Sequence, residues 1–179
     1  MNDTRKEDFN HCWKCYKKFQ QSSIPGTGSG KKSDTGIDFH LYDDLSALPH
    51  FDTSLTDRDT PDEVLNIREK IEHSAGVLFS TPEYIFSIPS RLKNLLEWCV
   101  STTVFSGKQV AVITASADGE KGHEELVMIL KTLGATIEHQ HQLLIKGIKG
   151  RFKDGLLENN TFARVSTLIT DFESVVSHN

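Results

Sequence analysis

The sequence predicts an α/β domain whose parallel sheet is covered by helices on both faces. Two continuous apolar runs, 76–80 and 109–114, have the composition of strands that are buried on both faces. Segments with apolar residues at helical spacing precede, separate and follow these runs. Strands that alternate with helices in this order pair in parallel through crossover connections, which is the basis of this prediction.

Two further strands are predicted from weaker patterns. Ile37–Tyr42 alternates apolar and polar residues, as a half-covered strand does. Gln142–Ile145 has the composition of a short last strand. His139 and His141 fall at strand spacing, and we expect solvent-facing polar positions there, because a metal site would need a third ligand that the sequence does not supply.

The expected helices have recognisable ends. The first is predicted to begin with Thr60 as N-cap, Pro61 at the first position and Glu63 completing a capping box. Ser87 is the expected N-cap of the second helix, and Gly134 is expected to end the third. The apolar faces of these helices and of a C-terminal helix are predicted to contain Val64, Ile67, Ile71, Leu92, Leu95, Leu96, Cys99, Leu126, Ile129, Leu130, Leu133, Phe162, Val165, Leu168, Ile169, Phe172 and Val176.

The bulk composition is that of one domain. With 179 residues, of which 37% are hydrophobic, the chain has enough apolar material for a single packed core, so we expect one domain over residues 1–179. Residues 22–36 are rich in glycine, serine and lysine and are expected to form a flexible insertion. Within it, the run 26–32 lacks the preceding strand and the full spacing of a phosphate loop, so a linker is the favoured interpretation.

Charge and cysteine content argue against several classes of protein. The net charge of −5 disfavours a nucleic-acid binder, and no apolar run reaches the length of about 18 residues that a membrane span requires. The polar N-terminus lacks the apolar core of a secretory signal, and three cysteines suit a reducing compartment, so a cytoplasmic location is predicted. Cys12 and Cys15 form a C-x-x-C, which we interpret as two thiols on a helix, because no strand precedes it.

Two loops are expected to carry the chemistry. In an open α/β sheet, ligands bind beyond the carboxyl ends of the strands. Residues 81–87 and 116–123 each leave such a strand end and contain small or polar residues. The first loop runs directly into the predicted start of a helix, where free N–H groups can bind a ligand. His123 lies in the second loop and could either contact a ligand or serve the start of the next helix.

The first loop and the helix after it resemble a known family. The run Thr81-Pro82-Glu83-Tyr84, Ser87-Ile88-Pro89, Leu92-Lys93-Asn94 and Trp98 resembles the T-P-E-Y-x-x-S-I-P-x-x-L-K-N-x-x-x-W run of the NADPH-dependent FMN reductases. Residues 106–108 and 114–116, and the segment 41–51, are similar to that family as well. The resemblance covers the chain from about Ile37 to its C-terminus and implies a flavodoxin-like fold.

The resemblance also implies the function and the site. It implies bound FMN, reduced by NADPH or NADH, and electron transfer to a small-molecule acceptor such as a free flavin, a quinone or an azo compound. Such proteins form homodimers or homotetramers, and the reaction needs no side-chain acid or base, so no catalytic residue is expected. The resemblance further implies that the flavin ring is lined, mostly through backbone groups, by Thr81, Pro82, Glu83, Tyr84 and Ile85, with Ser116 and Gly119 approaching from the second loop.

Four side chains in the first loop and its helix have open roles. Ile85-Phe86 stands where many members of the family have Asn-Gly. Trp98 is expected to pack on its helix face or at a subunit contact rather than to stack on the flavin. Glu83 is expected to be structural or to contact backbone rather than to act as a general base.

The N-terminal residues depart from the family pattern. Thr4, Arg5 and Asn10 match a phosphate loop of the form G-S-[TL]-R-x-x-S-x-N, but Asp3 and Asp8 replace its two serines. The sequence begins at this loop, so the predicted flavodoxin-like sheet lacks the usual first strand, which is central in such folds. At about 4 Å and an effective dielectric near 20, one carboxylate repels a phosphate charge by roughly 4 kcal/mol. We therefore expect the phosphate end of the site to be weak unless it is remodelled.

Several hypotheses follow from this departure. The chain is either a truncated version of a working reductase, which would account for the missing strand but not for Asp3 and Asp8, or a decayed paralogue. The leading hypothesis for its function is a flavin reductase that binds FMN without a covalent bond. The alternatives are a degenerate flavodoxin-like protein with weak or no FMN binding, acting as a structural or interaction protein, and an electron carrier that uses FMN without reacting with nicotinamide.

Overall fold

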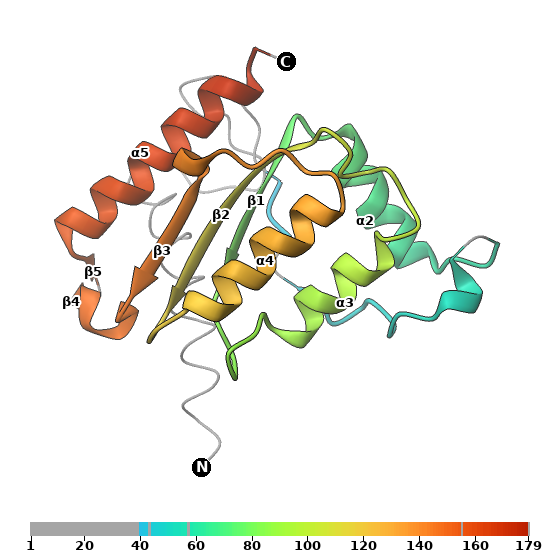
Figure 1. Cartoon of the computed structure of the whole chain (residues 1–179), viewed down its shortest axis with the longest axis horizontal. Coiled ribbons are helices and arrows are strands. Elements are labelled where there is room, and N and C mark those ends of the chain that lie inside the picture. Colours follow the sequence, from blue (N-terminus) through green and yellow to red (C-terminus); the bar gives the residue numbers. More distant parts are fainter. Residues whose placement is uncertain (1–39, 43, 57, 155, 179) are drawn as a thin grey trace.

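Three parallel strands form the sheet on which the candidate site is built. The computed structural model describes residues 40–42, 44–56, 58–154 and 156–178. Among these residues, β1 (Gly76–Thr81), β2 (Gln109–Ser116) and β3 (Gln142–Lys146) pair in the order β1-β2-β3. Both pairings are parallel, and the register sets Thr81 opposite Thr114 and Ser116 opposite Lys146. The carboxyl ends of all three strands therefore meet at one edge, which is the lower edge in Figure 1.

The sheet is covered on both faces, as predicted. Helices α2 (Asp62–His73), α3 (Ser90–Trp98) and α4 (Glu120–Thr132) share one hydrophobic cluster with Phe79, Val110 and Val112. Helix α5 (Asn159–Val176) packs on the opposite face against Ala111 and Ile113. Successive residues of β2 thus point to opposite faces, and nearly all are buried, which explains the continuous apolar run. Figure 1 shows α4 and α3 on one flank of the sheet and α5 on the other.

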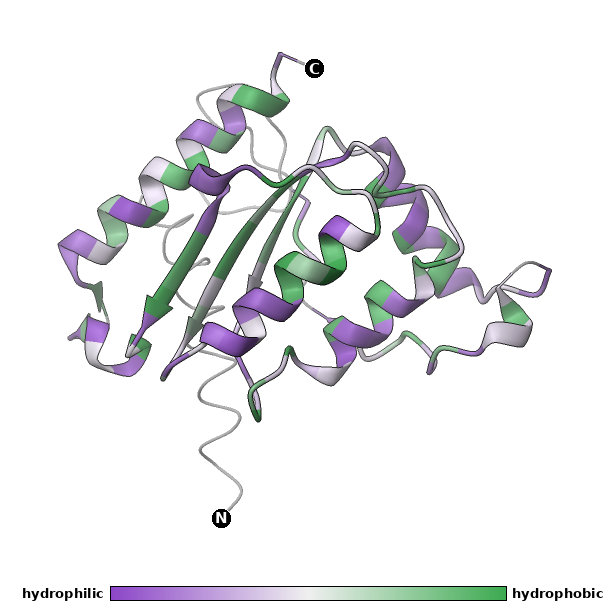
Figure 2. Ribbon diagram, in the orientation of Figure 1, coloured by the Kyte–Doolittle hydropathy of each residue, from purple (hydrophilic) through white to green (hydrophobic). Residues whose placement is uncertain are grey.

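The helices present the apolar faces that the sequence predicts. Val64, Ile67 and Ile71 of α2 are buried, as are the expected residues of α3, and hydrophilic residues lie on the outer faces (Figure 2). Gly134 follows α4 with φ of +89°, the left-handed conformation of a terminating glycine. None of the helices among the described residues is long and apolar enough to cross a membrane.

Helix α3 is the centre of the first face, and it holds two neighbouring segments. The indole of Trp98 is fully buried, and its Nε1–H donates to the carbonyl of Pro49 at 2.9 Å. Asn94 binds the same segment twice, because its amide donates to Pro49 and its carbonyl accepts from the N–H of Phe51 at 2.8 Å. Buried Arg68 of α2 donates to the carbonyl of Trp98 through both Nε and Nη2, so a cation satisfies the C-terminal end of α3.

Two predicted features of the N-terminal half are wrong in the described residues. His40–Tyr42 form no strand, because no described strand pairs with them, and Leu41 and Tyr42 stay exposed. The capping box at Thr60 does not form either. Its hydroxyl donates to the carbonyls of Leu55 and Thr56, and α2 begins at Asp62 without a side-chain cap. Residues 37–39, the insertion 22–36, the C-x-x-C and the expected absence of a first strand all lie outside the described residues.

The prediction for the two histidines is half wrong. They lie in the short 3-10 helix η2 (His139–His141), where His139 is exposed but His141 is fully buried. The His141 ring packs edge-on against Phe172 of α5 at 5.3 Å between centroids, and neither ring nitrogen has a hydrogen-bond partner among the described residues. The strand spacing that predicted a shared face does not apply, because the two residues lie in a 3-10 helix, and only His141 packs against α5.

Short elements complete the chain, and the sequence patterns did not predict them. The 3-10 helices η1 (Thr53–Leu55) and η3 (Ile148–Arg151) lie in connections. Strands β4 (Phe152–Lys153) and β5 (Leu156–Leu157) form a two-residue antiparallel ribbon before α5. Elements of two to four residues are too short to show a period in sequence.

The packing of β1 against α5 gives a testable prediction. A Cβ added at Gly76 would lie 2.6 Å from Val176 Cγ1 and 2.8 Å from Phe172 Cζ, whereas one at Gly150 would meet nothing within 4 Å. We expect Gly76→Ala to lower the free energy of unfolding by about 1–3 kcal/mol, because the helix must shift. Gly150→Ala is the matched control, and we expect a change below about 0.5 kcal/mol. Urea denaturation of both variants tests this, and equal midpoints would contradict the packing.

Candidate functional site

The two predicted loops meet at the carboxyl edge of the sheet, and one carboxylate joins them. Glu83, in the loop after β1, accepts a hydrogen bond from the N–H of Gly119 at 3.2 Å on Oε1. Its Oε2 accepts from the N–H of Gly122 at 2.8 Å. Gly119 is the N-cap residue of α4, so these are two of the free N–H groups at the start of that helix. The side chain of Glu83 thus caps a helix that begins 37 positions later in the chain.

Two glycines make this contact possible. Gly119 has φ of +83°, and a Cβ there would lie 2.9 Å from Leu144 Cδ1. A Cβ at Gly122 would lie 3.1 Å from Glu83 Cγ and 3.2 Å from the carbonyl oxygen of Ser87. The first turn of α4 therefore packs directly on the side chain of Glu83 and on the backbone of Ser87. Ser116 adds a longer hydrogen bond, in which its hydroxyl donates to the carbonyl of Glu83 at 3.4 Å.

The loop after β1 closes in a tight two-residue turn. The N–H of Tyr84 donates to the carbonyl of Ser87 at 2.8 Å, and the N–H of Ser87 donates back to Tyr84 at 3.0 Å. The central residues, Ile85 and Phe86, have φ of +52° and +58°. Positive φ at both central positions defines a type I′ turn. The backbone N–H groups of Ile85 and Phe86 have no hydrogen-bond partner among the described residues, so they are available to a ligand.

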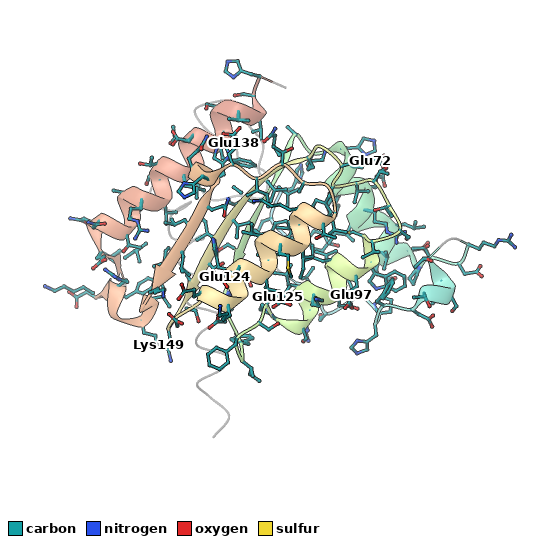
Figure 3. The ribbon with its side chains drawn as sticks, in the orientation of Figure 1. Glu72, Glu97, Glu124, Glu125, Glu138 and Lys149 are labelled. Atoms are coloured by element: carbon teal, nitrogen blue, oxygen red, sulfur yellow. The ribbon has the colours of Figure 1, made fainter. Side chains whose placement is uncertain are left out.

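A second carboxylate anchors the other end of the turn. Glu125 of α4 accepts from the hydroxyl of Ser87 at 2.6 Å and from the N–H of Ile88 at 3.2 Å, and it lies 3.5 Å from Lys93 Nζ. Figure 3 shows Glu125 on the side of α4 that faces α3. Burial alone would raise the pKa of Glu125, but the hydrogen bonds and the nearby ammonium outweigh it and lower the pKa below its ordinary value. Ser87 is therefore not the N-cap of α3, which begins at Ser90 after Pro89.

The second loop is fixed by charges and by one histidine. Lys146 of β3 lies 2.8 Å from Asp118 and 3.0 Å from Glu120, and hydrogen bonds to these two carboxylates raise its pKa. His123, in the first turn of α4, is hydrogen-bonded through Nδ1 to the hydroxyl of buried Thr114 at 2.9 Å. Partial burial lowers the pKa of His123, which favours the neutral form of the ring.

The predicted site residues have different roles in this arrangement. Thr81 and Pro82 are buried, and the Thr81 hydroxyl donates to the carbonyl of Pro82 at 3.1 Å. The Glu83 carboxylate is engaged by α4, whereas Ile85 is almost fully exposed. The two joined loops and the strand ends before them thus contain seven of the predicted site residues: Thr81, Pro82, Glu83, Tyr84, Ile85, Ser116 and Gly119. The N-terminal residues discussed with the phosphate end lie outside the described residues: Thr4, Arg5, Asn10, Asp3 and Asp8.

Sequence reasoning missed two anchors of the site. Glu125 sits inside a helix, and no local pattern distinguishes it from the neighbouring exposed Glu124. Gly122 could have been noticed as a glycine in the first turn of a helix, where glycine is unfavourable without a packing reason.

Other chemistry-bearing features of the described residues lie away from this edge. A groove of about 620 Å³ runs along α4 and is lined by seven residues, of which His123 alone belongs to the two loops. Burial raises the pKa of the Cys99 thiol to about 11, so it is unreactive at neutral pH. No group of three or more potential metal ligands occurs among the residues that the structure describes.

The capping contact of Glu83 predicts a loss of stability on its removal. We expect Glu83→Ala to lower the free energy of unfolding by about 1–2 kcal/mol, because two N–H groups at the start of α4 lose their acceptor. Glu83→Gln keeps one acceptor oxygen and should lose less. Glu69→Ala, on the exposed surface of α2, is the matched control. Thermal unfolding monitored by circular dichroism measures the difference, and equal loss in Glu69→Ala would refute the capping role.

The anchoring contact of Glu125 predicts a dependence on pH. A carboxyl whose pKa is lower in the folded chain than its ordinary value of 4.5 stabilises the fold above that value. This stabilisation is lost as the pH falls through the lowered pKa. We expect Glu125→Gln to be less stable than the parent at pH 7, with the difference shrinking below about pH 4.5. Urea midpoints at pH 7, 5 and 3.5 test the prediction, and a difference that does not vary with pH would contradict it.

Comparison with solved structures identifies the class of fold. The structure superimposes on FerB, a flavoenzyme NAD(P)H:(acceptor) oxidoreductase from Paracoccus denitrificans, with a TM-score of 0.70 and 24% identity. The match covers 95% of this chain and 90% of FerB. The likeness shows that the fold is flavodoxin-like, as predicted.

Comparison of sequences identifies the family of the chain. An NAD(P)H:quinone oxidoreductase of Solanum tuberosum is 38% identical over 48% of this chain and 44% of its own length. An NAD(P)H-dependent FMN reductase of Pseudomonas aeruginosa is 36% identical over 41% of each. The chain spans less than half the length of these two relatives. Residues 27–149, more than half of the chain, match the model of one family. The two joined loops lie within this segment, and the chain belongs to the NADPH-dependent FMN reductase family.

Proposed function

We propose that this chain is an NAD(P)H-dependent FMN reductase that binds FMN non-covalently and passes electrons to a flavin, a quinone or an azo compound. The observation that carries the proposal is the contact of Glu83 with the start of α4. It joins the loop after β1 to the loop after β2 at the edge where ligands of such sheets bind. Relatives whose names are FMN reductase and quinone oxidoreductase support the same reaction class.

The residues present fit the ring of FMN. The pyrimidine edge of an isoalloxazine carries carbonyl oxygens, which need hydrogen-bond donors. The unpaired N–H groups of Ile85 and Phe86 supply such donors, and the contacts of Glu83, Ser87 and Glu125 hold the turn that carries them. Preorganised backbone donors bind a rigid aromatic ligand without the entropy cost of ordering a loop. For the phosphate end of FMN we propose Thr4, Arg5 and Asn10, on the resemblance alone.

The protein itself contributes binding and orientation. Bound FMN supplies a ring that accepts a hydride equivalent from NAD(P)H and returns two electrons to an acceptor. Hydride transfer between nicotinamide and flavin needs no acid or base from the protein. The carboxylates of Glu83 and Glu125 accept hydrogen bonds from the protein, and His123 is bonded to Thr114. We therefore propose no catalytic residue.

Assembly and location belong to the same proposal. We propose a homodimer or homotetramer in the cytoplasm, with a small-molecule acceptor as the physiological partner. The support for assembly is the family, and the support for the location is the sparse cysteine content and the charge.

The first experiment is a titration of FMN into the purified chain, followed by addition of NADPH without oxygen. We expect quenching of flavin fluorescence on binding and bleaching of the oxidised flavin absorbance after NADPH. Binding without bleaching by NADPH or NADH would favour the electron carrier. The absence of binding at tens of micromolar FMN would favour a structural or interaction protein and would refute the reductase.

Two glycine variants test whether the second loop shapes the flavin site. Gly119 and Gly107 both have positive φ, so an added Cβ strains the backbone at each, but only at Gly119 does it meet a neighbour. Gly107 lies before β2, at the opposite end of that strand. We expect Gly119→Ala to weaken FMN binding by about tenfold or more, since the loop must move away from Leu144, and Gly107→Ala to leave it within about twofold. Fluorescence titration measures the dissociation constant for FMN of both variants. Equal values would contradict a role of the second loop in the flavin site.

A further inference from the structure

The turn Tyr84–Ser87 has an unusual composition for its geometry. A type I′ turn requires positive φ at both central positions, and it strongly prefers asparagine and glycine there. This chain has Ile85 and Phe86, with φ of +52° and +58°. A left-handed conformation costs an ordinary residue roughly 1–2 kcal/mol, and the β-branched side chain of isoleucine is among the least suited to it. The turn is therefore strained at two consecutive residues.

Burial does not compensate for this strain. Ile85 is 92% exposed and Phe86 is 72% exposed, which makes Ile85 the most exposed of the large hydrophobic residues that the structure describes. In Figure 2 the tip of this turn projects from the lower edge of the molecule and carries the colour of hydrophobic residues. A strained backbone that presents two large apolar side chains to water is unfavourable for folding on both counts. Such features persist at functional sites.

The base of the turn is held firmly, so its tip cannot relax by swinging away. On one side, the carboxylate of Glu83 binds the start of α4. On the other side, Ser87 and Ile88 bind Glu125. The two side chains at the tip are thus presented at a fixed place, beside the N–H groups proposed to bind the flavin ring.

From this arrangement we infer that Ile85 and Phe86 form an apolar wall that selects the electron acceptor, favouring a flat apolar quinone over a small polar acceptor. The inference rests on the proposed function and adds the class of acceptor to it. The quinone would take up two electrons and two protons, with a hydride equivalent supplied by NAD(P)H and one proton by solvent, and would leave as the hydroquinone.

The size of the apolar surface favours a small molecule over a second protein. Two side chains offer a few hundred Å² of contact at most, whereas a stable protein interface buries about 1,200 Å² or more. At the starts of the helices that follow the two loops, the exposed residues Ser90 and Arg91 of α3 and Lys121 of α4 are polar and add no apolar surface. An isolated apolar wall of this size matches one face of a naphthoquinone.

The test replaces the tip by residues that suit the turn. The variant Ile85→Asn/Phe86→Gly keeps the backbone geometry and removes both apolar side chains. The matched control is Val100→Asn, which removes an exposed apolar side chain just after the C-terminal end of α3 and outside the two loops of the candidate site. The probes are 2-methyl-1,4-naphthoquinone as the apolar acceptor and ferricyanide as the polar one, with FMN-saturated protein and NADPH. Equilibrium dialysis of the naphthoquinone against the oxidised, FMN-loaded protein gives a readout independent of turnover.

The inference predicts a selective effect. In the double variant, we expect the melting temperature to rise by several degrees as the strain is removed. All measurements on it are made at saturating FMN, because the N–H groups of these two residues are proposed to bind the ring. The KM and the dissociation constant for the naphthoquinone should rise about tenfold, which corresponds to partial loss of two apolar contacts. The kcat/KM for ferricyanide should fall by much less than the kcat/KM for the naphthoquinone. Val100→Asn should alter none of these values.

Three results would overturn the inference. An equal loss with both acceptors would mean that the tip shapes the whole site, and no loss with either would mean that it has no role in acceptor choice. A shift from dimer to monomer in the double variant, seen by sedimentation velocity, would assign the tip to a contact between two copies. If the parent oxidises no NADPH even with ferricyanide, the proposed function fails instead. Equilibrium dialysis of the naphthoquinone against the FMN-free parent then tests whether the apolar wall binds a quinone. The absence of binding in that experiment would overturn the inference as well.

Discussion

The arrangement of the candidate site depends on one carboxylate at the start of one helix. Glu83 accepts hydrogen bonds from Gly119 and Gly122, so an anion from the loop after β1 lies at the positive end of α4. The charge-assisted bonds are partly shielded from water, where they are stronger than on an open surface. Because the bond partners come from loops after neighbouring strands, this contact fixes the distance between the two loops. The absence of side chains at Gly119 and Gly122 allows the backbones to approach closely enough for it to form.

Most side chains of the sequence run 81–98 hold the scaffold and leave the backbone for the ligand. Asn94 and Trp98 bind the segment around Pro49, Ser87 binds Glu125, and Glu83 binds α4. None of these side chains needs to touch a flavin. The N–H groups at the tip of the turn, which we propose to face the ligand, have no partner among the described residues, and the side chains behind them set their position. A run of amino acids can therefore mark a cofactor site even though its side chains act mainly on one another.

The tip of the turn shows how stability and function can oppose each other in a few residues. The clamps at Glu83 and Glu125 stabilise the base of the turn, while Ile85 and Phe86 destabilise its tip through positive φ and exposure. The two effects fit together physically, because only a firmly held base can keep a strained tip in one conformation. The two hydrophobic clusters follow the usual pattern, in which large apolar residues lie between the sheet and its helices.

The sequence by itself determined the class of fold, the order of the sheet strands and the α-helices from residue 60 onward, and the two loops of the candidate site. Local sequence patterns predict these features: apolar runs indicate the buried strands, helical spacing indicates α2 to α5, and a glycine indicates the end of α4. Tertiary structure alone decided which residues these carboxylates bind, because Glu83 and Glu125 act on residues more than 30 positions away, which no local pattern identifies. It also decided that His141 is buried and that His40–Tyr42 form no strand, since burial and pairing depend on what packs alongside. Local patterns report the conformation that a segment prefers, whereas the site is made by contacts between segments that only the folded chain brings together.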